Sequence, residues 1–118
     1  MRNHKSLLAW QRAHSVVSRV LDASDKYWRP SAGAVFSQLQ RAALSVQLNI
    51  AEGYALRSVG YLRRHLTIAY GSAVETSDLL EILQERQLIP LEEITVVVGT
   101  AEETQALIMG LLRRVRRH

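Results

Sequence analysis

The chain has 118 residues, of which 47% are apolar, with a formal net charge of +4 and no cysteine, so it is long enough for one domain with a core and too short for two. The lack of cysteine excludes a disulfide framework and thiolate chemistry, which suits the reducing cytoplasm in which we expect the protein. No apolar run approaches the roughly 20 residues that a membrane-spanning helix needs, and the apolar stretch Leu7–Trp10 is broken too soon for a secretory signal, so we expect no membrane partner.

Apolar residues recur at alternating steps of three and four in four segments, which predicts helices over residues 6–28, 34–54, 58–87 and 91–117. The run Ile94–Val98 has the composition of a strand, but the helical period on both sides outweighs it. The residues expected to face the core are, in chain order, Leu7, Trp10, His14, Val17, Leu21, Ser24 and Trp28, then Phe36, Leu39, Ala43, Val46, Ile50 and Gly53, then Leu62, Leu66, Ala69, Ala73, Thr76, Leu80 and Leu83, and last Ile94, Val97, Ala101, Thr104, Ile108, Leu111 and Val115.

The breaks between these segments hold residues that end and start helices. Pro30 disfavours a helix at the residue before it, Ser58 is placed to cap the third helix, and Pro90 suits the first turn of the last helix. Short connections between helices of this length imply antiparallel neighbours. The expected fold is all-α, a single domain over residues 1–118 folded as an antiparallel up-and-down four-helix bundle.

Polar residues interrupt the apolar pattern in the stretch SVQLNIAEGY, residues 45–54. In a hairpin of the second and third helices about residue 56, Asn49 lies opposite residues 63 and 64, and Glu52 lies opposite residue 61 or 62, within reach of Arg63 or of backbone groups. Burying such groups unpaired costs several kcal/mol. We therefore interpret Asn49 and Glu52 as hydrogen-bonded groups that fix the register of the hairpin.

The same pairing places Ala42 and Ala43 near Gly71, inside an otherwise good helix. A glycine there costs about 1 kcal/mol relative to alanine. Close packing of the two helices at Gly71 is expected to offset this cost.

Three stretches of the chain resemble motifs of a known family. QLQRAALSVQLNIAEGYALRS, followed by LTIAYGSAVE, is similar to the S-x-Q-L-R-R-A-A-x-S-I-P-x-N-I-A-E-G signature of the small bacterial four-helix-bundle proteins encoded by intervening sequences in 23S ribosomal RNA genes, and LLAWQRAH matches their usual opening. More distant kin are the accessory variability proteins of diversity-generating retroelements. The chain departs from the pattern at Gln40, Gln47, Gly60 and Tyr61, which weakens the transfer of a basic surface. The motif residues, for which we expect a structural role, are Asn49, Glu52, Gly53, Gly71, Ser72 and Glu75.

The resemblance implies a left-handed up-and-down bundle that assembles as a homopentamer ring. It also implies a poorly defined role, with binding of RNA or DNA as the leading proposal. In the retroelement branch, it implies action beside a reverse transcriptase.

Nothing in the pattern favours catalysis, a metal site or a cofactor. Glu52 and Glu75 would lie about 20 Å apart along the hairpin, too far for joint acid–base work. His14 and His65 are solitary, without metal-ligand spacing, and the chain has no GxSxG and no phosphate-binding GxxxxGK[ST]. We expect a protein that is not an enzyme.

Basic residues are unevenly placed: residues 1–70 hold ten Lys and Arg against three Asp and Glu, whereas residues 71–112 hold one against eight. Several cations near phosphates give salt-dependent affinity without sequence preference. We expect such binding, with an oligomeric scaffold or protein-partner adaptor as the alternative. The candidate nucleic-acid-binding residues are Arg57, Arg63, Arg64, Arg113, Arg114, Arg116 and Arg117.

Further large apolar residues lie off the four core stripes, which predicts a broad apolar surface. Exposed patches of this kind usually meet a partner. These residues are Leu8, Val16, Val20, Leu44, Leu48, Ile68, Leu79, Ile82, Val98 and Leu112.

Overall fold

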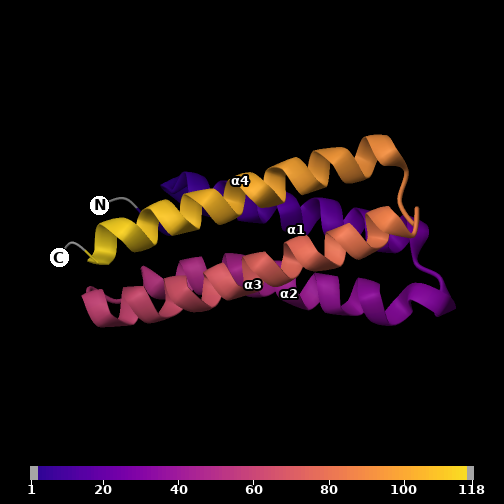
Figure 1. The fold of residues 1–118 in the computed structure, drawn as a ribbon. Coiled ribbons are helices and arrows are strands. Elements are labelled where there is room, and N and C mark those ends of the chain that lie inside the picture. The colour runs from indigo at the N-terminus through magenta and orange to yellow at the C-terminus, as the bar shows by residue number, and fades with distance from the viewer. Residues whose placement is uncertain (1–2, 117–118) are drawn as a thin grey trace.

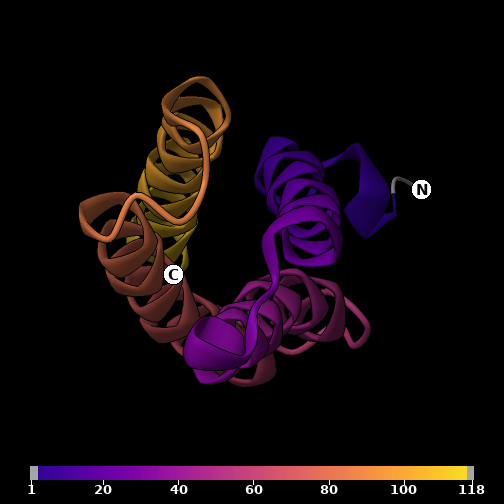
Figure 2. The ribbon, with the colours of Figure 1, turned by 90° about the vertical axis from the view of Figure 1, so that its right-hand side faces the viewer.

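The computed structural model describes residues 3–116, and it describes Arg116 by its backbone alone. Consecutive helices run antiparallel and pack on one another, and α1 also packs on α4, which closes the bundle (Figure 1). Seen from the end at which α1 stops, the helices follow one another clockwise, which is the left-handed order (Figure 2). The predicted up-and-down bundle is confirmed. Its helices are α1 (Leu8–Tyr27), α2 (Gly33–Gly53), α3 (Val59–Glu85) and α4 (Leu91–Arg116), and 3-10 turns η1 (His4–Ser6) and η2 (Pro30–Ala32) precede α1 and α2.

The helix boundaries follow local signals in the chain. Ser58 caps α3 as predicted, because its Oγ accepts the backbone N–H of Tyr61 at 3.2 Å. Pro90 lies just before α4 rather than in its first turn, and its carbonyl accepts the N–H groups of Glu93 and Ile94, each at 3.0 Å. Gln87 turns the chain between α3 and α4 with a φ of 54°, in the left-handed region.

A layer of small residues divides the core into two halves. Each helix contributes one alanine to this layer, at Ala13, Ala43, Ala73 and Ala101, and the cavity beside them measures only about 10 Å³. Thr76, also in the layer, donates its hydroxyl to the Ser72 carbonyl at 2.8 Å, so this buried polar group is satisfied. Larger apolar side chains form the core on both sides of this alanine layer.

The predicted core stripes are right for three helices and only partly right for α1, where Val17 and Ser24 are buried as predicted. In α2 and α4 every stripe residue is buried, and in α3 only Leu62 is less than fully buried. In α1, by contrast, His14, Leu21 and Trp28 are exposed. The residues of α1 that face the core are Ala9, Ala13, Val16, Val17, Val20, Ala23 and Ser24.

Gly71 does not have the role predicted for it. It is exposed, and a Cβ added to it would meet no atom within 4 Å. Ala42 and Ala43 are buried, so α2 and α3 do pack closely, but Gly71 points away from that contact. Within one chain, packing therefore does not offset the cost of this glycine.

The broad apolar surface predicted for the chain is only partly present. Val16, Val20 and Leu112 belong to the core. Leu8, Leu44, Leu48, Ile68 and Ile82 are exposed. In residues 3–116, no helix is both long enough and apolar enough to cross a membrane.

Candidate nucleic-acid interface

A chain of polar contacts joins α2 to α3. Asn49 donates its side-chain N–H groups to the carbonyl and the Oγ of Ser45, at 2.9 and 3.1 Å. Its Oδ1 lies 2.9 Å from Nδ1 of His65 on α3, and because an amide oxygen only accepts, His65 is the donor. The Ser45 and Ser72 hydroxyls share a hydrogen bond of 2.7 Å. Asn49 is thus held from both helices.

Glu52 extends these contacts toward the hairpin. Tyr61 donates its hydroxyl to Glu52 Oε2 at 2.8 Å, and this hydrogen bond is the main reason why the pKa of Tyr61 is raised. The Tyr61 ring lies against the His65 ring, with 4.4 Å between centroids, and His65 Nε2 lies 4.0 Å from Glu52 Oε2. Glu52 therefore meets Tyr61, one of the two positions expected, and not Arg63.

The partner of Asn49 differs from the one predicted. Arg63 and Arg64 were expected opposite Asn49, but both are exposed, and His65 makes the contact instead. His65, which the sequence shows without metal-ligand spacing, has a hydrogen-bond partner 16 residues back in the chain and a ring contact 4 residues back on its own helix. No pattern in the sequence around His65 indicates that this side chain lies beside the half-buried amide of Asn49 on the neighbouring helix.

The other motif residues lie apart from these contacts or at their edge. Glu75 is exposed on α3. Gly53 ends α2 in a tight position, because an added Cβ would lie 3.1 Å from Leu62 and 3.3 Å from His65. Across residues 3–116, no group of three or more histidine or acidic side chains is placed to hold a metal ion.

Arginines from two distant segments gather at one end of the bundle, which we call the basic end. The turn between α2 and α3, the start of α1 and the end of α4 all lie there (Figure 1). Burial raises the pKa of Tyr54, at the end of α2, and the positive charge of Arg114 on α4 opposes this rise, which places Arg114 close to the turn. The exposed arginines of the basic end are Arg57, Arg63, Arg64, Arg113 and Arg114. The side chain of Arg116, and the whole of Arg117, lie outside the described residues.

An open hollow of about 560 Å³ lies at the basic end, between η1 and the α2–α3 turn. Leu7, Leu56 and Leu62 give it apolar walls, while Ser58 and Arg57 give it polar groups. The space is large enough for a planar group flanked by apolar side chains and a cation.

The opposite end of the bundle, where α1 stops and α4 starts, carries most of the acidic residues. The charge separation seen along the sequence thus becomes a separation along a bundle 45 Å long. The acidic residues of this acidic end are Asp22, Asp25, Asp78, Glu81, Glu85, Glu92 and Glu93.

The fold and the motifs agree with a comparison of the chain with protein-family models. Residues 5–110 match the model described as 23S rRNA-intervening sequence protein. The chain belongs to this family. In this member of the 23S rRNA-intervening sequence protein family, the matched residues cover most of the bundle described above.

A solved structure shares the bundle of this family member. It is a crystal structure of a protein with unknown function from the S23 ribosomal protein family of Bacteroides thetaiotaomicron, with a TM-score of 0.80 and 20% sequence identity over 90% of this chain and 96% of that one. At this identity the likeness shows the fold alone. A search of curated proteins found no match.

Proposed function

We propose that this protein binds nucleic acid through its basic end. The observation that supports the proposal is the gathering of arginines from the α2–α3 turn, the start of α3 and the end of α4, with Arg114 close enough to Tyr54 to affect its pKa. Phosphate contacts by Lys and Arg supply sequence-independent affinity, because counterions are released from the nucleic acid. Glu52 is engaged with Tyr61 and Glu75 is exposed on another part of α3, so binding rather than catalysis is the role we infer.

The hollow beside these arginines favours a single strand over a duplex. Sequence-tolerant binding of single strands combines a basic groove with surfaces on which unstacked bases pack. The leucine walls of the hollow can cover the faces of one base, and Arg57 lies at its edge. A duplex keeps its bases stacked inside and would use the arginines alone.

The test is fluorescence anisotropy with labelled single-stranded and duplex RNA and DNA of about 20 nucleotides, over a salt series. Replacing Arg63 and Arg64 together by alanine is expected to weaken binding about tenfold at low salt. The slope of log K against log salt should fall in magnitude by about 1.4 for a single strand and about 1.8 for a duplex, since two phosphate contacts are lost. Both arginines are exposed, so the fold is expected to persist.

The matched control replaces Arg29 and Arg86 by alanine, which removes the same charge from exposed positions at the acidic end. Net charge then falls equally in both variants, so a purely global effect would weaken binding equally. Equal loss in the two variants, or no binding of the wild-type protein at about 50 mM salt, would refute an interface at the basic end.

A second candidate role, an oligomeric scaffold, is favoured by the apolar outer face of α2 and α3. Leu44 and Leu48 lie one turn apart on α2 and are 38% and 57% exposed. The contacts of Ser45 with Ser72 and of Asn49 with His65 set the helix register, which places Ile68, 41% exposed, beside Leu48. A helix that is apolar on both its inner and outer faces needs a partner. We propose that this face joins copies of the chain, and the ring of five is what the family resemblance implies.

Replacing Leu44 and Leu48 together by glutamine is expected to lower the molar mass in solution toward that of the 13.3 kDa monomer, because two large apolar side chains leave the contact. Light scattering coupled to gel filtration measures the mass. The control is the replacement of Leu91 and Val96 by glutamine, which are 69% and 45% exposed on α4. An unchanged mass in the first variant, or a monomeric wild-type protein, would count against the scaffold. A protein partner such as a reverse transcriptase, and a cytoplasmic location, stay predictions.

A further inference from the structure

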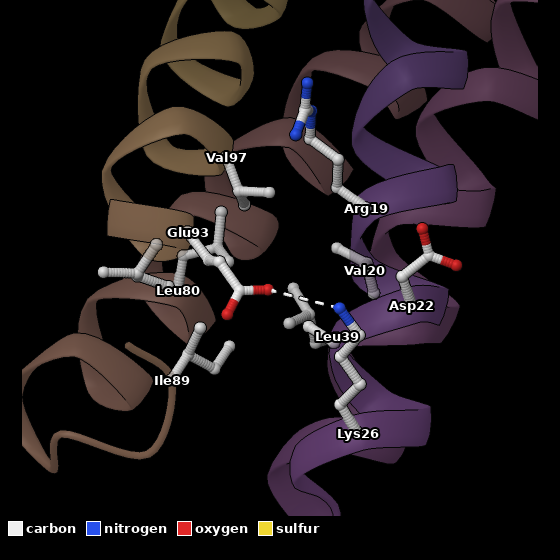
Figure 3. Close-up of a pocket in the computed structure, with 11 residues that line it drawn as sticks. Arg19, Val20, Asp22, Lys26, Leu39, Leu80, Ile89, Glu93 and Val97 are labelled. Carbon is white, nitrogen blue, oxygen red and sulfur yellow. Dashed lines mark ion pairs between the residues drawn. The ribbon is translucent and has the colours of Figure 1, made fainter. Parts of the chain in front are cut away.

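A cavity of about 190 Å³ lies between α1 and α4 near the acidic end of the bundle. Its floor is apolar and is formed by residues of all four helices, among them Val20 on α1, Leu39 on α2, Leu80 on α3 and Val97 on α4 (Figure 3). Here α1 and α4 carry larger side chains than at the alanine layer, and their facing surfaces do not fill the space between them. The cavity opens between charged side chains on its rim.

The size of the cavity sets the size of what it can hold. An engineered apolar cavity of about 150 Å³ lined by leucine, isoleucine and phenylalanine stays dry and binds benzene. The space in this protein, at about 190 Å³, is slightly larger, and it has an aliphatic floor but four charged residues in its lining. It therefore suits an apolar body of about six to eight non-hydrogen atoms.

The charged rim adds a preference for one kind of head group. Glu93 on α4 already accepts a hydrogen bond from the Tyr27 hydroxyl, and Lys26 Nζ lies 3.9 Å from its other carboxylate oxygen. Arg19, also on the rim, has no ion pair among residues 3–116. The Asp22 carboxylate points away from the gap between the helices (Figure 3). Two cations on the rim thus border the space above the apolar floor. The guanidinium of Arg19 is in no ion pair among residues 3–116, and the ammonium of Lys26 is in a long ion pair with Glu93.

We propose that this cavity is a binding site for a small organic acid, with its aliphatic or aromatic body against the apolar floor and its carboxylate on Arg19. A guanidinium binds a carboxylate through two parallel hydrogen bonds, which gives both affinity and orientation. Lys26 can turn from Glu93 to the ligand, because Glu93 keeps the Tyr27 hydroxyl as a donor. The site lies at the opposite end from the arginines proposed to bind nucleic acid, so either proposal can fail without the other.

The probes are hexanoate and benzoate, with hexanol and benzyl alcohol as neutral counterparts of the same shape. Titration followed by amide NMR spectra is expected to show saturable shifts along α1 and α4 with a Kd of about 1 mM or tighter for the acids, and about tenfold weaker binding of the alcohols. Replacing Arg19 by glutamine should weaken binding of the acids about tenfold and leave the alcohols unchanged. The control Arg41→Gln removes an exposed arginine from the outer side of α2 and should change neither.

A variant whose cavity is filled by a larger side chain shows whether the ligands bind in this cavity or elsewhere on the protein. Val97→Phe places a ring in the space and is expected to abolish binding of acids and alcohols alike, while the melting temperature stays equal or rises because a void is filled. If Val97→Phe does not fold, the Arg19 comparison still decides. The proposal is wrong if the wild-type protein shows no saturable shifts up to about 10 mM acid, if Arg19→Gln binds the acids as the wild type does, or if a folded Val97→Phe still binds them.

Discussion

Replacing Phe36 by alanine is expected to lower the free energy of unfolding by about 3–5 kcal/mol, a large part of the 5–15 kcal/mol that stabilises a typical domain. Phe36 is the only phenylalanine in the chain and is fully buried, with a relative exposure of 0%. It lies in the half of the core that also contains Leu80 and Ile94, so its truncation leaves a void among buried side chains. Urea denaturation followed by circular dichroism measures the loss.

The control for this variant is Leu91→Ala, because Leu91 is 69% exposed and its truncation should cost less than about 0.5 kcal/mol. All denaturation curves need one fixed protein concentration, since association would add to the apparent stability. A loss below about 1.5 kcal/mol for Phe36→Ala would mean that this half of the core is not packed as described.

Replacing Asn49 by leucine is expected to cost about 1–3 kcal/mol, although leucine has a similar size and is the better helix former. The change removes the acceptor of the His65 Nδ1–H and the donors to Ser45, and these groups are half-buried between α2 and α3. Leaving such groups unpaired costs more than the hydrogen bond itself contributes. Denaturant unfolding measures the difference.

Gln47→Leu is the matched control for Asn49→Leu. Gln47 lies on the same helix and also bonds a histidine, His14, at 3.0 Å, but that contact is exposed and water can replace it. We expect a change within about 0.5 kcal/mol. Equal losses of unfolding free energy in the two variants would show that the Asn49 contacts stabilise the hairpin no more than an exposed contact does.

The sequence pattern predicted most of the bundle because large apolar residues mark the buried faces of α2, α3 and α4. It was only partly right for α1, where mostly alanines and valines face the core and the larger Leu21 and Trp28 do not. Trp28, assigned to the core, is 56% exposed and lies over Gly33, whose missing side chain makes room: an added Cβ would lie 2.9 Å from the indole ring. Size alone therefore misplaces the buried face of a helix whose neighbours require small residues.

The sequence predicted that Asn49 and Glu52 form hydrogen bonds in the hairpin of α2 and α3, but it did not predict the partner of Asn49. The hairpin register estimated from loop length was wrong by one or two residues, and that is enough to replace Arg63 and Arg64 by His65 as the partner of Asn49. The gathering of arginines from α3 and α4 was less predictable still, since it depends on both chain ends and the α2–α3 turn lying together. The cavity between α1 and α4 depends on the local spacing of two helices, which no residue pattern specifies.

The alanine layer has a consequence for how the two ends of the molecule are connected. Four methyl groups, from Ala13, Ala43, Ala73 and Ala101, meet at mid-length, so no large side chain reaches from one half of the core into the other there. Energetic coupling is strong mainly between residues that are in contact or share partners. We therefore expect a substitution in one half of the core, away from the layer, and a substitution in the other half to have additive effects on the stability of the protein.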